Sequence, residues 1–122
     1  MSKPIRLILG TMTFGPQVDL EGSRAMVRRF LDAGHSEIDT AYVYNKGDSE
    51  RFLGSALAEA PGTAATVATK VNPRVTGRLD RDAVVSQVTE SLNRLRLDSV
   101  ELLYLHFPDP NTPVETDRKS VV

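Results

Sequence analysis

Short hydrophobic runs alternate with amphipathic stretches along most of the chain. Three amphipathic stretches have helical spacing; Asp19 and Asp80 stand where the first and third would be capped. The second begins near Asp48–Ser49 and is ended by Pro61–Gly62. Four runs rich in Ile, Val, Leu and Thr are typical of short strands, at residues 5–10, 37–41, 66–71 and 100–106. The pattern predicts the order β-α-β-α-β-α-β.

The apolar faces of the three helices predict much of the core. They comprise Met26, Val27, Phe30 and Leu31 in the first helix, Phe52, Leu53, Ala56, Leu57 and Ala60 in the second, and Val84, Val85, Val88, Leu92 and Leu95 in the third.

Polar residues follow the hydrophobic runs at regular intervals. Lys70 comes 31 residues after Asp39, and His106 comes 36 residues after Lys70, so each interval is about one βαβ unit. Right-handed crossovers would make the strands parallel and bring their carboxyl ends to one edge. Ligands bind at that edge in both barrels and open α/β sheets. We therefore predict an α/β protein with a site containing Asp39, Tyr44, Lys70 and His106.

Composition narrows the classes of protein to consider. The 122 residues predict one domain, and 40% apolar and 25% charged residues are ordinary globular values. A net charge of −1 with scattered basic residues argues against nucleic acid or an anionic membrane as partner. There is no cysteine, and the amino terminus lacks the apolar run of a signal peptide. We expect a cytoplasmic protein without a membrane span.

The four site residues suit one kind of chemistry. A tyrosine is a poor acid near neutrality, with a usual pKa of about 10, but a nearby ammonium favours its phenolate. A carboxylate beside Lys70 would hold that ammonium charged, so Tyr44 could protonate a carbonyl oxygen as hydride reaches the carbon. His106 could donate a second hydrogen bond to the same oxygen. If this interpretation holds, Lys70 Nζ and an Asp39 carboxylate oxygen should lie about 2.7–3.2 Å apart.

The segments GHSEIDTAYVYNKGDSE, ATKVNP and YLHFPDPNTPVE resemble those of the aldo-keto reductases, particularly the aflatoxin-aldehyde reductase branch. The resemblance implies that Asp39, Tyr44, Lys70 and His106 form the catalytic tetrad. In these roles Tyr44 donates the proton and Lys70 lowers its pKa. Asp39 orients Lys70 and itself lies beside the cofactor, and His106 binds and orients the substrate carbonyl. Thr11 and Met12 match the loop that approaches the nicotinamide.

The same resemblance implies a fold, the first half of a (β/α)8 TIM barrel with four parallel strands. It also implies an activity, the NADPH-dependent reduction of aldehydes or ketones to alcohols. We expect residues 1–115 to form this amino-terminal half and residues 116–122 to be a divergent polar tail. Family members continue into four more β/α units, which carry most of the cofactor site. We therefore weigh a second hypothesis, a truncated and catalytically silent fragment.

A half-barrel has unpaired edges at its first and fourth strands, through which copies could self-associate. We expect its uncovered inward face to carry Leu7, Leu9 and Ile38. A third hypothesis, a lyase that uses Lys70 as a Schiff-base nucleophile, gives Tyr44 no necessary role. No metal site is predicted, because His106 and Asp109 are too few ligands.

One further histidine, His35, precedes its strand. We therefore expect it on the opposite, structural face of the fold.

Overall fold

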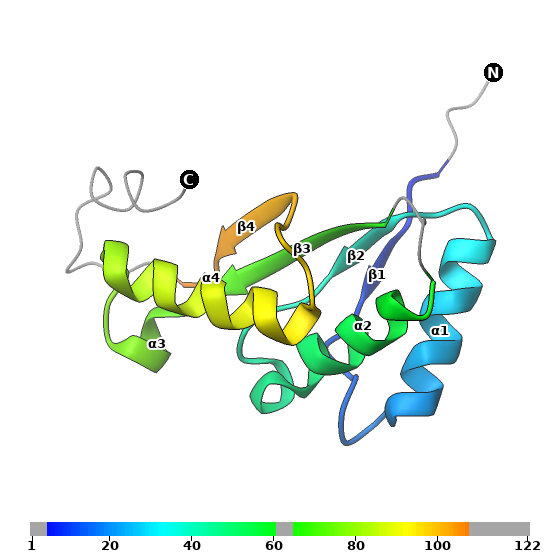
Figure 1. Ribbon diagram of the computed structural model, residues 1–122, viewed down its shortest axis with the longest axis horizontal. Helices are drawn as coiled ribbons and strands as arrows, with labels where there is room; N and C mark the ends of the chain where they lie inside the picture. The colour runs from blue at the N-terminus through cyan, green and yellow to red at the C-terminus, as the bar shows by residue number, and fades with distance from the viewer. Residues whose placement is uncertain (1–4, 61–64, 108–122) are drawn as a thin grey trace.

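A four-stranded parallel sheet forms the centre of the molecule in a computed structural model, which describes residues 5–60 and 65–107. The strands stand in the order β1-β2-β3-β4 (Figure 1). Their bounds are Ile8–Gly10 for β1, Glu37–Asp39 for β2, Thr66–Val71 for β3 and Leu102–Leu105 for β4. The predicted parallel arrangement and strand order are confirmed, and the strands β1, β2 and β4 are shorter than the hydrophobic runs suggested.

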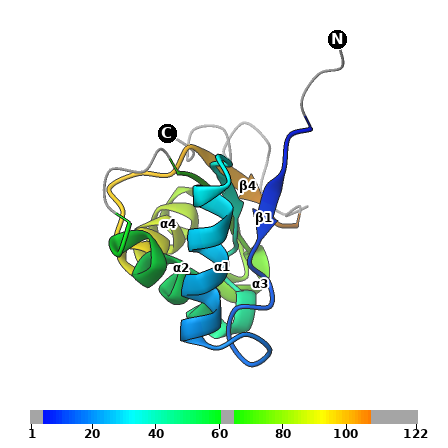
Figure 2. The ribbon, with the colours of Figure 1, turned by 90° about the vertical axis from the view of Figure 1, so that its right-hand side faces the viewer.

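Three long helices connect the strands and cover one side of the sheet (Figures 1 and 2). They are α1 (Leu20–Asp32), α2 (Asp48–Ala58) and α4 (Arg81–Leu95). The predicted caps are confirmed, because Asp19 accepts from the Gly22 amide and Asp80 accepts from the Ala83 amide. Two short elements were not predicted: the 3₁₀ helix η1 (Tyr44–Gly47) and α3 (Pro73–Thr76).

The core lies between these helices and the sheet. Leu53 of α2 and Leu95 of α4 are wholly buried, and they cluster with Val27, Ile38 and Val67. Phe14 belongs to the same cluster at 0% exposure, although it lies between β1 and α1 and sequence reasoning did not select it.

The prediction of burial in the core is wrong for two residues. Met26 and Val85 are 40% and 45% exposed, because each lies about 100° around its helix from a buried neighbour, at the border of the apolar stripe.

The two faces of the sheet are the reverse of our expectation. The pairing register places Leu9, Ile38 and Val67 side by side, and Ile38 is only 1% exposed because this face packs against the helices. The prediction that Leu9 and Ile38 lie on an uncovered inward face was therefore wrong. Side chains alternate along a strand, so the open face carries Ile8 and Asp39 instead. The same alternation places Asp39 where it can reach Lys70.

The outer strands leave hydrogen-bonding edges available. Within the described ranges, β1 pairs only with β2 and β4 only with β3. Self-association through these edges stays a prediction. No helix in residues 5–60 or 65–107 is long and apolar enough to cross a membrane. The predicted tail, residues 116–122, lies outside the described residues.

Candidate active site

The carboxyl ends of the strands bring the four predicted site residues together. Asp39 is the last residue of β2, and Lys70 is the penultimate residue of β3. His106 directly follows β4, where its backbone amide donates to the Val71 carbonyl at 2.8 Å. Tyr44 begins η1, five residues beyond Asp39. One sheet edge therefore positions side chains from three successive loops and strand ends.

Lys70 is at the centre of this group. Its Nζ donates to Asp39 Oδ2 at 2.7 Å and to the Thr40 carbonyl at 2.8 Å, and it lies 3.3 Å from the Tyr44 hydroxyl. The same nitrogen is 4.9 Å from the centre of the Tyr44 ring. The predicted separation between Lys70 and Asp39 is confirmed. Because the Lys70 side chain is only 16% exposed, its charge interacts with these partners under weak solvent screening.

His106 borders Tyr44 on the other side. The two rings meet edge to face, with centroids 5.8 Å apart, and the imidazole stacks on Phe107 at 5.0 Å. Burial, together with the positive charge of Lys70, lowers the pKa of His106 below its usual 6.5. The imidazole is therefore neutral near pH 7. Its Nδ1 atom is buried without a hydrogen-bond partner among the residues that the structure describes.

A cluster of buried hydroxyl groups is hydrogen-bonded to the backbone of Asp39. Ser49 Oγ lies 2.7 Å from Thr11 Oγ1 and 2.9 Å from Thr40 Oγ1, and Thr11 Oγ1 also donates to the Asp39 carbonyl at 3.0 Å. Each of these three residues is fully buried. Sequence reasoning missed Thr40 and Ser49 as site supports, although both lie inside the quoted DTAYVYNKGDS segment.

The two predicted cofactor residues of the first loop are placed differently. Thr11 is wholly buried and its hydroxyl is already bonded within the protein, while Met12 is 62% exposed. Cofactor contact stays a prediction for both.

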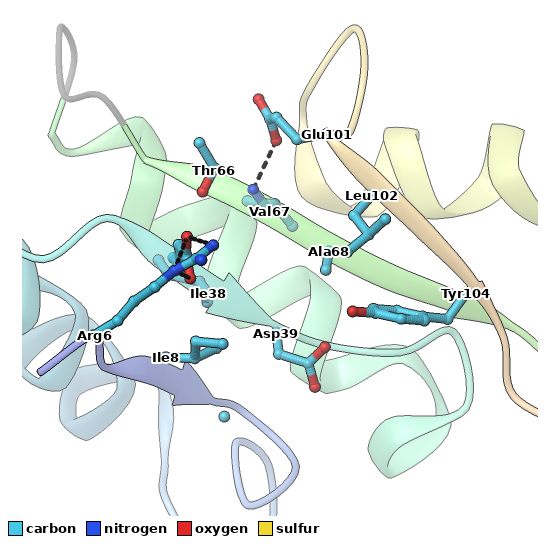
Figure 3. A pocket seen from close by; sticks show the side chains of 12 residues that line it. Arg6, Ile8, Ile38, Asp39, Thr66, Val67, Ala68, Glu101, Leu102 and Tyr104 are labelled. Atoms are coloured by element: carbon cyan, nitrogen blue, oxygen red, sulfur yellow. Dashed lines mark hydrogen bonds and ion pairs between the residues drawn. The ribbon is translucent and has the colours of Figure 1, made fainter.

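A hollow of about 700 Å³ lies on the open face of the sheet (Figure 3). Asp39 and Tyr104 point into one end of it, whereas Arg6 and Glu101 lie towards the other end. Of the four candidate site residues, Asp39 lines this hollow, whereas Tyr44, Lys70 and His106 do not.

His35 lies away from the site, as expected. It precedes β2, and its ring packs on Phe30 of α1 with centroids 5.2 Å apart. Within the described part of the chain, no three His, Cys, Asp or Glu residues are grouped to hold a metal ion. Asp109 lies outside the described residues.

Comparison with known proteins identifies the family. Residues 6–119 match the model of the Aldo/keto reductase family, which is nearly the whole chain. The chain belongs to this family. This aldo/keto reductase chain is 45% identical to human aflatoxin B1 aldehyde reductase member 2 over 121 residues, covering 94% of the chain and 34% of the relative. The predicted resemblance to the aflatoxin-aldehyde reductase branch is thus confirmed, and the chain spans about a third of the length of such relatives.

Solved structures of other aldo-keto reductases share the fold. The enzyme of Bacillus halodurans in its holo form matches with a TM-score of 0.81 and 29% identity, over 94% of this chain and 40% of that one. The enzyme of Klebsiella pneumoniae in complex with NADPH matches with a TM-score of 0.78 and 26% identity, over 93% and 39% of the two chains. The four parallel strands and the helices between them therefore match part of a (β/α)8 barrel, which confirms the predicted fold class.

Proposed function

We propose that the chain carries the proton-transfer site of an NADPH-dependent reductase that converts aldehydes or ketones to alcohols, with Tyr44 as the proton donor. The observation that carries this proposal is the position of Lys70, whose ammonium contacts both the Tyr44 hydroxyl and the Asp39 carboxylate. Membership of the aldo/keto reductase family supports the reaction class. A small carbonyl compound would be the substrate.

In this mechanism the ammonium of Lys70 stabilises the phenolate that Tyr44 becomes when it gives up its proton. Asp39 and the Thr40 carbonyl hold that ammonium in place through bonds of 2.7 and 2.8 Å. Charges fixed in advance lower the barrier because they need no reorganisation as the reaction proceeds. NADPH, when bound, supplies the hydride for the carbonyl carbon.

His106 would bind the carbonyl oxygen beside Tyr44. Its lowered pKa keeps the imidazole neutral near pH 7, and a neutral imidazole retains one N–H to donate. A second hydrogen bond to the oxygen stabilises the negative charge that develops there. The Tyr44 and His106 rings are in edge-to-face contact with centroids 5.8 Å apart, so one substrate oxygen could reach both side chains.

The described residues fit the nicotinamide end of the cofactor. The Asp39 side chain is 30% exposed at the open edge of the sheet, next to the exposed Met12 loop. Thr11 would act indirectly, because it is wholly buried and both its hydroxyl and its backbone amide donate to the Asp39 carbonyl. Asp39 and Met12 would hold the reactive end of NADPH near Tyr44.

The alternative is that the isolated chain is catalytically silent. Two observations favour it: the chain spans about a third of the length of its relatives, and the open face of the sheet exposes Ile8 and Leu102 at 60% and 48%. Under this alternative, the proton-transfer residues need further barrel units before the reaction can run.

Binding and turnover together decide between the two. Purified chain would be titrated with NADPH by fluorescence, and NADPH consumption would be followed with an aromatic aldehyde. Saturable binding with alcohol formation supports the reductase. A folded, monodisperse chain that neither binds NADPH nor forms alcohol rules out autonomous catalysis and leaves the silent chain. Borohydride trapping of an aldehyde on Lys70 would revive the lyase hypothesis instead.

A further inference from the structure

The segment that carries Tyr44, residues 42–47, has an unusual backbone; we call it the Tyr44 loop. Asn45, Lys46 and Gly47 have φ angles of 51°, 57° and 96°, so three successive residues occupy the left-handed region. This region disfavours side chains with a Cβ atom, and only Gly47 avoids the penalty. Such strain persists only where the surrounding structure holds it. The loop therefore needs identifiable contacts to keep Tyr44 against Lys70.

One set of contacts comes from the segment after β1. Asn45 Nδ2 donates to the Met12 carbonyl at 2.7 Å and to the Phe14 carbonyl at 2.6 Å. Asparagine is also one of the few side chains that tolerate the left-handed region. These bonds hold the middle of the Tyr44 loop. At its beginning the Tyr42 amide donates to the Lys70 carbonyl at 3.1 Å, which leaves the Tyr42 carbonyl to find another partner.

Arg94 is the partner of the Tyr42 carbonyl. It projects from the last turn of α4, and its Nη1 donates to the Tyr42 carbonyl at 2.8 Å. Its guanidinium carbon lies 4.2 Å from the centre of the Tyr42 ring, and its Nη2 donates to Glu90 at 2.9 Å. Gly47 shows how close the approach is, because a Cβ there would lie 2.6 Å from Arg94 Cζ. One arginine thus contacts both ends of the Tyr44 loop.

Glu50 connects this arginine to β3. Its carboxylate is fully buried and accepts two hydrogen bonds, from Arg94 Nη1 at 3.0 Å and from Thr69 Oγ1 at 2.7 Å. Thr69 immediately precedes Lys70 in the strand. Burial acts to lower the pKa of Arg94, but the hydrogen bond and charge of Glu50, together with the charge of Glu90, outweigh it, so the pKa of Arg94 is raised.

A buried ion pair is weak evidence for stability, because desolvation offsets much of its attraction. This pair has a geometric consequence instead. Through Glu50 and Thr69 it fixes the Tyr42 carbonyl relative to the strand that carries Lys70. We propose that Arg94, with Glu50, is a positioning residue that holds the Tyr44 loop so that the Tyr44 hydroxyl stays against Lys70. The catalytic consequence of this proposal rests on the function proposed above.

Hydrogen exchange of backbone amides tests the positioning without any need for activity. The Tyr44 amide donates to the Ala41 carbonyl and the Lys46 amide to the Val43 carbonyl, both at 3.2 Å, so these two amides report on the loop. In Arg94→Met, we expect both to exchange about 10- to 100-fold faster, the factor for losing a hydrogen bond to a charged group. Amides of β2 and β3 should keep their rates.

Two further variants keep the test decisive. Arg94→Met alone leaves the Glu50 carboxylate buried without its cation, which could impair folding. The double variant Arg94→Met with Glu50→Gln removes that charge as well and should still loosen the Tyr44 loop. Arg24→Met is the matched control, because Arg24 joins α1 to Ser55 and Glu59 of the second helix region, away from the loop. It should leave the exchange of the Tyr44 and Lys46 amides unchanged.

Unchanged loop exchange in both Arg94 variants would overturn the proposal, as would an increase shared equally by all amides. Where turnover is measurable, the proposal expects kcat to fall in Arg94→Met with KM within about twofold, because the affected group acts in the transition state. Arg94→Lys, which keeps a charge for Glu50, should recover part of that loss. If the wild-type chain shows no turnover, the proposed function fails while the exchange experiment still decides the positioning.

Discussion

Gly54 should resist replacement by alanine, although it lies inside a helix. It is a buried residue of α2 at the contact with α4, and α2 and α4 pack directly against each other (Figure 1). A Cβ atom at Gly54 would lie 2.5 Å from the Arg94 carbonyl oxygen and 2.8 Å from the carbonyl carbon of Leu95. Both atoms belong to backbone, so no rotamer change can relieve the overlap.

Two opposing effects set the size of the change. Alanine is a better helix former than glycine by about 0.8–1.0 kcal/mol, which favours the variant. Against this, ordinary contact begins at 3.4 Å, so the two helices would have to separate by most of an ångström. Overpacking of this kind costs about 1–3 kcal/mol and sometimes more. Separation would also loosen Leu53 and Leu95, so we expect a net loss of about 1–2 kcal/mol in the free energy of unfolding.

Urea unfolding followed by circular dichroism measures this loss. Ser86→Ala in α4 is the control, because Ser86 is exposed and the substitution improves helix propensity by about 0.5 kcal/mol without a clash. The control should raise the midpoint slightly, and Gly54→Ala should lower it. A Gly54→Ala chain as stable as the wild type, or more so, would show that α2 and α4 do not pack as described.

Three further outcomes follow from the structure. Phe14→Ala should lower the free energy of unfolding by about 3–5 kcal/mol in urea, because Phe14 is wholly buried, whereas Met12→Ala at an exposed site should change it little. Asp19→Ala should cost about 0.5–2 kcal/mol through the lost cap, and an unchanged midpoint would contradict that bond. NMR titration should place the pKa of His106 in the folded chain below 6.5, and Lys70→Met should raise that pKa. Because the unfolded wild-type chain binds the proton more readily than the folded one, protonation of His106 reduces stability as the pH falls below about 6.5.

Much of the fold could be predicted from periodicity. The three long helices follow directly from apolar spacing, and Asp19 and Asp80 marked two of their starts. The 3₁₀ helix and α3 were not predicted, because four-residue elements are too short to show a period. Pro73 after Asn72 was the available signal for α3, since Asn72 caps it and Pro73 occupies its first turn.

The sheet faces were harder to predict than the strands. Leu9 and Ile38 were expected on the open face, yet they pack on the helices, and the alternation Glu37–Ile38–Asp39 contained the answer. Since Asp39 must reach Lys70 on the open side, its neighbour Ile38 has to point to the helices.

The proximity of the four candidate site residues could be predicted because each lies within five residues of the end of a strand, where sequence spacing translates into proximity. The supporting residues could not. Their bonds cross long sequence separations: 30 residues from Thr40 to Lys70, 38 from Ser49 to Thr11 and 52 from Arg94 to Tyr42. Nothing in a local pattern distinguishes Arg94 from a solvated helix arginine, and only the packing of α4 on α2 brings it to the Tyr44 loop.

The central claim is that Tyr44 donates the proton in carbonyl reduction, and the rate of aldehyde reduction by Tyr44→Phe tests it most directly. Tyr104→Phe serves as the control, because it removes the same hydroxyl from a side chain that is 45% exposed. We expect Tyr44→Phe to lose about 10²–10⁴-fold in rate while NADPH affinity is kept, and Tyr104→Phe to match the wild type. Wild-type turnover by Tyr44→Phe would contradict the account.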